Sequence, residues 1–231
     1  MSGLVLSSSS VATYLDCHLQ WWFAYVVRDP GKPREQTLVG IATHDLVESL
    51  LTDPKSLRRQ PGHVWDEAYR LLPVFEAEVL PQLGTVRYVE QVYQFEIEGF
   101  YYQSYLDYVD GSNRVRDLKT TSRRPGPHDE RYRVPMIGHA LGFRSLTGEI
   151  EADVILDYLV RTKTPYYWPI ASGGPVSEDD EEFFIATLEG VTKGIAARDY
   201  DPTGLGSPWA CLSCPYQDQC GPYQRSKEIA G

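Results

Sequence analysis

The stretch from residue 86 to 119 constrains the fold most, because strand-forming runs alternate there with tight-turn signals. Three such runs follow one another, the first two rich in Tyr, Val and Phe: residues 86–97, 100–109 and 114–119. Glu98-Gly99 separates the first two, and Asp110-Gly-Ser-Asn113 separates the last two. Short polar and glycine-containing connections between such runs are typical of hairpins. The pattern predicts an antiparallel meander.

Helical periodicity surrounds this meander. Apolar residues recur at helical spacing in three earlier segments and one later segment: residues 7–27, 38–51, 63–79 and 132–146. Two further strands are expected at 152–160 and 166–170, before a last helix that Ser177 can cap. A chain of 231 residues is long enough for one sizeable core. We therefore expect a single α/β domain with a mixed sheet over residues 1–231.

The charge of the chain limits the kinds of partner it can have. The formal net charge is −10, which argues against a protein that coats nucleic acid through bulk positive charge. Basic residues nevertheless gather in one stretch, either as a solvated face or as a surface for an acidic partner: Arg114, Arg116, Lys119, Arg123, Arg124, Arg131 and Arg133. No apolar run is long enough for a membrane span, and the first residues lack a secretion signal, so a cytoplasmic location is expected.

Two carboxylates are expected to face each other across the second hairpin. A turn centred on Ser112 pairs Val109 with Val115 and Asp107 with Asp117. Directly opposed residues on antiparallel strands have Cβ atoms about 5 Å apart. Carboxylates that close repel each other, and each raises the pKa of the other unless a cation lies between them. Mg²⁺ or Mn²⁺, which prefer oxygen ligands, would suit such a pair.

Lys119 lies two residues beyond Asp117, so both side chains leave the same face of the strand. An ammonium beside a metal-bound carboxylate can orient a water molecule or offset the charge that develops on phosphorus. The alternative is a surface hairpin with an exposed ion pair, because an isolated D-x-K is very common. The apolar neighbours and the opposed Asp107 leave these two interpretations even on local grounds.

Three segments of the chain resemble motifs of the RecB-like PD-(D/E)XK nucleases. Asp107, followed by Asp117-Leu-Lys119-Thr-Thr, resembles their "G-x-I-D … D-Y-K-T" core. Gly40-Ile-Ala-Thr-His44 resembles their "G-T-x-x-H" helix. Leu6-Ser-Ser-Ser-Ser with the later Tyr14-Leu-Asp-Cys17 resembles their opening "L-S-x-S … Y-x-x-C-P-x-x-F" segment, with His18 in place of the proline. The matches occur in the family's order and cover nearly the whole chain.

The resemblance implies a fold, a site and an activity. The fold would be restriction-endonuclease-like, with a mixed central sheet flanked by helices. His44, Asp107, Asp117 and the backbone carbonyl of Leu118 would hold Mg²⁺ or Mn²⁺, and Lys119 would be catalytic beside the two acids. The activity would be that of a DNA exonuclease that hydrolyses phosphodiester bonds at single-stranded ends in the 5′→3′ direction. Its partners would be a recombinase, a helicase or a CRISPR integration complex.

Four cysteines are placed like ligands rather than like disulfide partners. Cys211, Cys214 and Cys220 form a C-x2-C-x5-C motif, and Cys17 lies near the N-terminus. Thiols in a reducing compartment are more often ligands than disulfides, and four thiolates suit either [4Fe–4S] or Zn²⁺. The split arrangement resembles the cluster of RecB-like exonucleases of CRISPR adaptation and of the AddB subunit. It favours an iron–sulfur cluster over zinc, and either of these over free buried thiols. It also implies that the cluster joins residues 1–30 to 201–231.

One departure from the family supports an alternative function. The family's Q-x-x-x-Y motif belongs on the helix after the D-x-K strand, and residues 135–143 contain no such pair, although His139 is a candidate substitute. The alternative is a non-catalytic DNA-end-binding or scaffold protein that retains the fold and the cluster.

Overall fold

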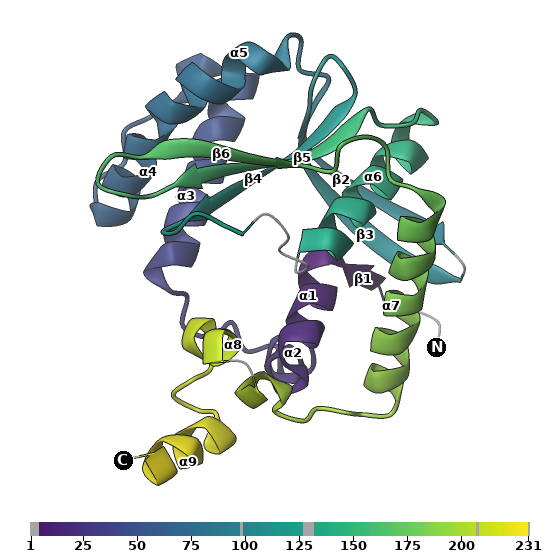
Figure 1. Ribbon diagram of the computed structural model, residues 1–231. Coiled ribbons are helices and arrows are strands. Elements are labelled where there is room, and N and C mark those ends of the chain that lie inside the picture. The colour runs from purple at the N-terminus through teal and green to yellow at the C-terminus, as the bar shows by residue number, and fades with distance from the viewer. Residues whose placement is uncertain (1–4, 98, 127–131, 207, 231) are drawn as a thin grey trace.

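A mixed sheet forms the centre of the protein (Figure 1). The computed structural model describes residues 5–97, 99–126, 132–206 and 208–230. The strands of this described part are β1 (Val5–Ser7), β2 (Tyr88–Ile97), β3 (Phe100–Val109), β4 (Arg114–Thr121), β5 (Asp153–Val160) and β6 (Tyr166–Ala171). Their order is β1-β3-β4-β5-β6, with β2 also paired to β3. The β4–β5 and β1–β3 pairs are parallel and the others antiparallel, so the predicted mixed sheet is confirmed.

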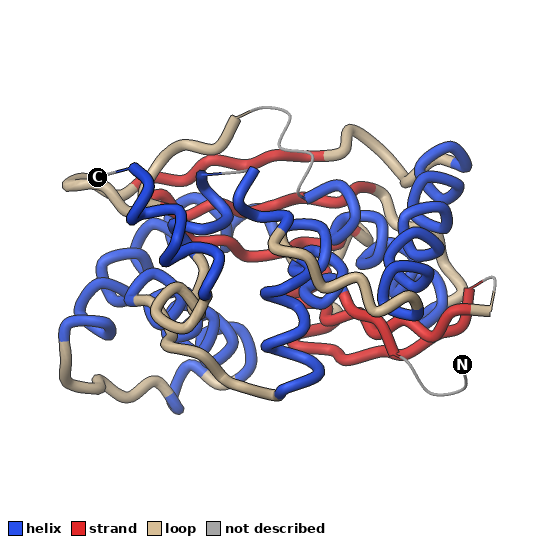
Figure 2. Tube along the Cα trace, turned by 90° about the horizontal axis from the view of Figure 1, so that it is seen from below, coloured by secondary structure: helices blue, strands red, loops and turns tan. Residues whose placement is uncertain are grey.

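Helices cover both faces of this sheet (Figures 1 and 2). One layer contains α3 (Glu35–Thr52), α4 (His63–Val74) and α5 (Leu80–Leu83). The other contains α1 (Ser8–Asp16), α6 (Arg133–Thr147) and α7 (Glu178–Ala196). Three short helices complete the termini: α2 (His18–Trp21), α8 (Pro208–Ser213) and α9 (Gly221–Ala230). No helix in the described ranges is both long enough and apolar enough to span a membrane.

Each face of the sheet has its own apolar core. Val39, Leu71 and Phe75 pack against Tyr108 and Leu118 on the α3–α5 face. The opposite core joins α1, α6 and α7 to β3 and β4 through residues including Val11, Phe143, Phe184, Tyr102 and Val115. Adjacent residues of a strand point to opposite faces, so β3 and β4 contribute to both cores.

Two of the predicted helices are interrupted in the structure. The expected helix over residues 7–27 is interrupted at Cys17, whose backbone is extended (φ −165°), and it resumes as α2 and a π-helical turn, Trp22–Val27. The helix expected at 63–79 likewise passes into a π-helical turn, Phe75–Val79. Neither break follows from apolar spacing. The short strand β1 was also not predicted. The capping prediction for Ser177 is confirmed, because its hydroxyl accepts a hydrogen bond from Asp180 N–H.

The second hairpin has the predicted register. Val109 pairs with Val115, and the carboxylate of Asp110 accepts hydrogen bonds from the backbone N–H groups of Ser112 and Arg114. In the first hairpin Ile97 pairs with Phe100, so the chain reverses at the predicted turn. Residue 98 of this turn lies outside the described residues.

The basic run is not one solvated face. Arg116 is fully buried and makes two hydrogen bonds of 2.8 Å each to the carboxylate of Asp157. Arg114 pairs with the buried Asp110. Both arginines therefore serve the interior of the sheet, since buried charges require partners. Arg131 lies outside the described residues.

The two ends of the chain contact each other. Leu19 N–H donates to the carbonyl of Asp201 at 3.1 Å, and the ring of Phe23 stacks on Tyr216 with centroids 5.1 Å apart. The hydroxyl of Tyr216 also donates to the carbonyl of Asp29 at 2.7 Å. The N-terminal helical segment thus lies against the tail, as Figure 1 shows for α2 and α8.

Candidate active site

The candidate site lies where β3 separates from β4. The ladder between them ends at Tyr108 opposite Arg116, and farther along β3 residues Tyr101–Gln103 pair with β1 instead. Asp107 is the first residue past the end of this ladder. Its carboxylate accepts a hydrogen bond of 2.7 Å from the backbone N–H of Leu118. The acid is therefore held against β4, beside Asp117.

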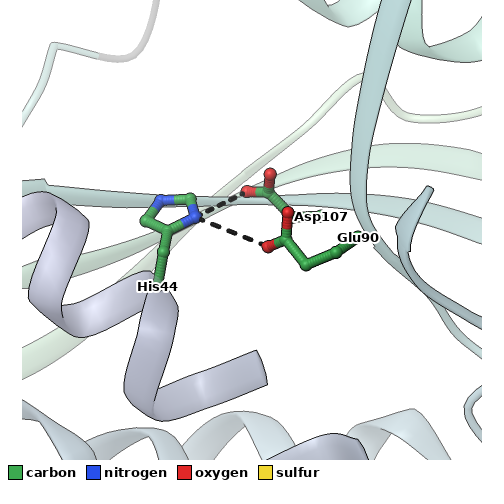
Figure 3. Close-up of side chains that lie close together, drawn as sticks. All are labelled: His44, Glu90 and Asp107. Carbon is green, nitrogen blue, oxygen red and sulfur yellow. Dashed lines mark ion pairs between the residues drawn. The ribbon is translucent and has the colours of Figure 1, made fainter. Parts of the chain in front are cut away.

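His44 reaches the same place from α3. A Cβ on Gly40 would lie 3.3 Å from the hydroxyl of Thr120, so the glycine permits α3 to lie close to β4. One turn later, His44 Nε2 lies 2.9 Å from the carbonyl oxygen of Leu118 and Nδ1 lies 3.6 Å from Asp107 Oδ2 (Figure 3). The predicted histidine, Asp107 and Leu118 are thus in contact with one another.

These distances fit the donor set of a divalent cation. Mg²⁺ prefers octahedral geometry with ligands at 2.0–2.1 Å, which places neighbouring ligand atoms about 3.0 Å apart. His44 Nε2 and the carbonyl of Leu118 are within hydrogen-bond distance of each other, and their separation of 2.9 Å equals the spacing of two such ligand positions. Carbonyl and carboxylate groups are the ligand types that Mg²⁺ and Mn²⁺ prefer.

Glu90 is a site residue that was not predicted. Its Oε1 lies 4.0 Å from His44 Nδ1, and His44, Glu90 and Asp107 bring ligand atoms within 4.8 Å of one another (Figure 3). Glu90 has φ +49°, a left-handed conformation that is uncommon outside glycine. The first hairpin carried a signal for it: Val89 pairs with Tyr108 and Gln91 with Leu106, so the position between them on β2 lies near Asp107, although Glu90 itself is not part of the ladder.

Lys119 is paired with Asp117. Its Nζ lies 2.7 Å and 2.6 Å from the two carboxylate oxygens of Asp117, which is only 3% exposed. Burial alone would lower the pKa of Lys119, but Asp117 and Asp107 outweigh burial and raise it. The amine therefore remains an ammonium, as the predicted role requires.

The two acids have opposite pKa shifts. Burial, followed by the charge of Asp117, raises the pKa of Asp107 to about 7. Burial also acts to raise the pKa of Asp117, but Lys119 and then His139 outweigh it and lower the pKa. In the absence of a cation, one acid therefore tends to hold a proton while its neighbour stays ionised.

His139 is also brought to the site, from α6. It is 4% exposed, and its Nε2 lies 3.7 Å from Asp117 Oδ1. Burial lowers its pKa, which favours a neutral ring. Its proximity to Asp117 could not be derived from spacing, because it depends on how α6 packs against the sheet.

A cavity of about 510 Å³ opens in front of these groups. Its walls are formed by α1 along its length and by the start of α6, and its lining includes Ser9, Asp16, Tyr132 and Pro135. Asp107, Asp117, Lys119 and His139 lie at its inner end. Pockets of 300–1,000 Å³ hold small organic ligands, so this volume suits a unit the size of a nucleotide.

The four predicted cysteines line a second cavity, between the two ends of the chain. Cys17, Cys211, Cys214 and Cys220 all contribute, together with Phe23 and Tyr216. All four are free thiols. Among the described residues, no three of them have sulfur atoms all within 4.8 Å of one another. Burial, with a smaller contribution from the other cysteines, raises the pKa of Cys214 to about 11.

Comparison with known proteins identifies the family. Residues 5–221 match the model of the PD-(D/E)XK nuclease superfamily. The chain belongs to this superfamily. No curated protein gives a significant match.

Solved structures agree in fold. A presumed exonuclease from Eubacterium rectale is 12% identical with a TM-score of 0.58, over 96% of this chain and 87% of that one. The protein SSO0001 is also 12% identical with a TM-score of 0.52, over 96% of this chain and 88% of that one. At this identity the likeness concerns the fold alone.

Proposed function

We propose that the protein is a Mg²⁺- or Mn²⁺-dependent deoxyribonuclease of the RecB-like type. It degrades single-stranded DNA from its ends, in the 5′→3′ direction. The observation that carries the proposal is the contact of His44 with Asp107 and the Leu118 carbonyl, next to the ion pair of Asp117 and Lys119 on the same strand as Leu118. The superfamily supports a nuclease, and the name of the Eubacterium rectale protein supports exonuclease action.

Each side chain has a role that follows from its position. His44, Asp107, Asp117 and the carbonyl of Leu118 would hold the cation, which supplies an activated water and stabilises charge on the phosphate. Lys119 projects from the same face of β4 as Asp117 and orients the attacking water or offsets developing charge. The cavity between α1 and α6 receives the end of the strand.

We also propose a [4Fe–4S] cluster in the cavity lined by Cys17, Cys211, Cys214 and Cys220. Tetrahedral zinc with Zn–S bonds of 2.3 Å needs sulfur atoms about 3.8 Å apart. The described cysteines contain no group of three within 4.8 Å, so they do not form such a zinc site as they stand. The cluster proposal rests on the split arrangement of the four cysteines and on the cavity that they share. The cluster would join residues 1–30 to 201–231 within one domain of residues 1–231. The expected compartment is the cytoplasm, where thiols stay reduced.

Purification without oxygen tests the cluster. We expect a brown protein with about four iron atoms per chain, and little iron when Cys214 is replaced by alanine. A colourless protein with one zinc and no iron would overturn the iron–sulfur proposal and leave the nuclease proposal intact.

The nuclease proposal is tested with single-stranded DNA labelled at either end, in the presence of Mn²⁺. We expect the wild-type protein to release short products from the 5′ end. Asp117→Asn and Lys119→Met should each reduce the rate by roughly 100-fold or more. The control Asp179→Asn, an exposed acid on α7, should leave the rate unchanged. Equal rates for all four proteins would overturn the site assignment.

The absence of a Q-x-x-x-Y pair from residues 135–143 keeps one other function open. A non-catalytic DNA-end-binding protein would bind labelled ends with Mn²⁺ present and release no product from any variant. A helicase, a recombinase or a CRISPR integration complex is the proposed partner in either case.

A further inference from the structure

We propose that His139 is a positioning residue for Asp117, holding its carboxylate between an imidazole and an ammonium at the cavity that Asp107, Asp117 and Lys119 line. This inference rests on the proposed metal-dependent function. His139 is distinct from the cation ligands, since it contacts Asp117 from the α6 side while His44 approaches from α3.

The close approach of α6 to β3 brings His139 to this position. A Cβ on Gly138 would lie 2.6 Å from the hydroxyl oxygen of Tyr102, and a Cβ on Gly142 would lie 2.6 Å from Ser104 Cβ. No side chain larger than hydrogen fits at either position without a shift. Two glycines flanking His139 therefore set the distance between helix and sheet at the residue that reaches Asp117.

Both ring nitrogens of the buried His139 face a polar side chain. Nδ1 lies 3.2 Å from the hydroxyl of Ser104, and Nε2 lies 3.7 Å from Asp117 Oδ1. Burying an imidazole is costly unless its polar atoms have partners. If the Ser104 hydroxyl donates to Nδ1, the proton of the neutral ring is on Nε2 and faces the carboxylate. This is the tautomer in which the ring N–H is directed at Asp117.

Asp117 is held from two sides as a result. Lys119 Nζ lies within 2.7 Å of both carboxylate oxygens, and His139 lies beyond Oδ1. The ammonium of Lys119 is at the end of a long, flexible side chain, and Lys119 also has the proposed catalytic role. His139 is a shorter side chain and is buried, with 4% exposed, so it provides the more fixed contact. Groups that orient metal ligands in this way typically change metal affinity or activity 10–100-fold when they are removed.

The test compares variants that separate the two ring nitrogens. His139→Gln carries an amide N–H near the Nε2 position, whereas His139→Asn reaches only the Nδ1 position near Ser104. His139→Leu fills the volume without polar atoms. We expect the Mn²⁺ dissociation constant, measured by calorimetry, to rise about 10-fold in His139→Leu and His139→Asn and to stay within about threefold of wild type in His139→Gln.

Kinetics and stability complete the test. We expect kcat on single-stranded DNA to follow the same order while KM for DNA stays constant, because His139 acts through Asp117. Thermal unfolding of each variant identifies any that fail to fold, and the Gln–Asn comparison remains when His139→Leu is unstable. Equal Mn²⁺ affinity and kcat for Gln and Asn would overturn the inference. A wild-type protein that neither binds Mn²⁺ nor cleaves DNA would instead overturn the proposed function.

Discussion

At the scale of residues, Asp107 and Asp117 share a buried site and yet favour opposite charge states. Asp117 has a cation in direct contact in Lys119, whereas Asp107 is compensated only in part, by His44, by the more distant Lys119 and by one backbone N–H. The raised pKa of Asp107 therefore records a site that lacks positive charge when no metal is bound.

A pH-dependent stability follows for the metal-free protein. The folded-state pKa of Asp107 is about 7, against 3.8 as the ordinary value. Between these values the folded state keeps a proton that the unfolded state has lost, so the contribution of Asp107 to stability falls as pH rises from about 4 to about 7. We expect the Tm of wild type, measured in chelator, to fall relative to that of Asp107→Asn across this window. Parallel pH profiles for the two proteins would contradict the assignment.

At the scale of elements, α6 is placed by its glycines. Gly142 lies against Ser104, so Gly142→Ala should force the helix away from β3. We expect a loss of about 1–3 kcal/mol in the free energy of unfolding, measured with denaturant, together with weaker Mn²⁺ binding. The matched control is Gly190→Ala in α7, where an added Cβ meets nothing within 4 Å. It should stabilise the protein by about 0.5–1 kcal/mol. A Gly142→Ala protein that is as stable as Gly190→Ala, or more stable, would contradict this account.

The predictability of the site differs between its elements. Hairpin register places Asp107 beside Asp117 from sequence alone, and the same reasoning extended to the first hairpin would have placed Glu90 near Asp107. His139 could not be placed in this way, because the contact of α6 with β3 depends on packing rather than on spacing. The break at Cys17 was also missed, because the spacing of apolar residues does not reveal a single extended residue between two helices.

At the scale of the whole molecule, the two ends of the chain meet around the four-cysteine cavity. Among the tail residues whose burial is described, Tyr216 is the buried hydrophobic one, and several hydrogen bonds of the tail go to residues 19–32. Its order should therefore depend on the group that the cysteines hold.

Replacing Cys17, which lies far from the other three cysteines in the sequence, tests whether the order of the tail depends on the bound group. We expect Cys17→Ala, purified without oxygen, to expose residues 201–230 to limited proteolysis several-fold faster than wild type, because the ligand nearest the N-terminus is missing. Glu182→Ala, an exposed change on α7, serves as control. Equal cleavage rates in Cys17→Ala and the control would show that the tail is held by protein contacts alone.

The central claim is that the acids of β3 and β4 and the histidine of α3 bind one divalent cation together. Titration of Mn²⁺ into the wild-type protein, His44→Ala, Asp107→Asn and Asp117→Asn, followed by electron paramagnetic resonance, tests it most directly. We predict one tight site in the wild type and at least about a 10-fold weaker site in each variant, with Glu182→Gln unchanged. Wild-type affinity in all three site variants would contradict the claim.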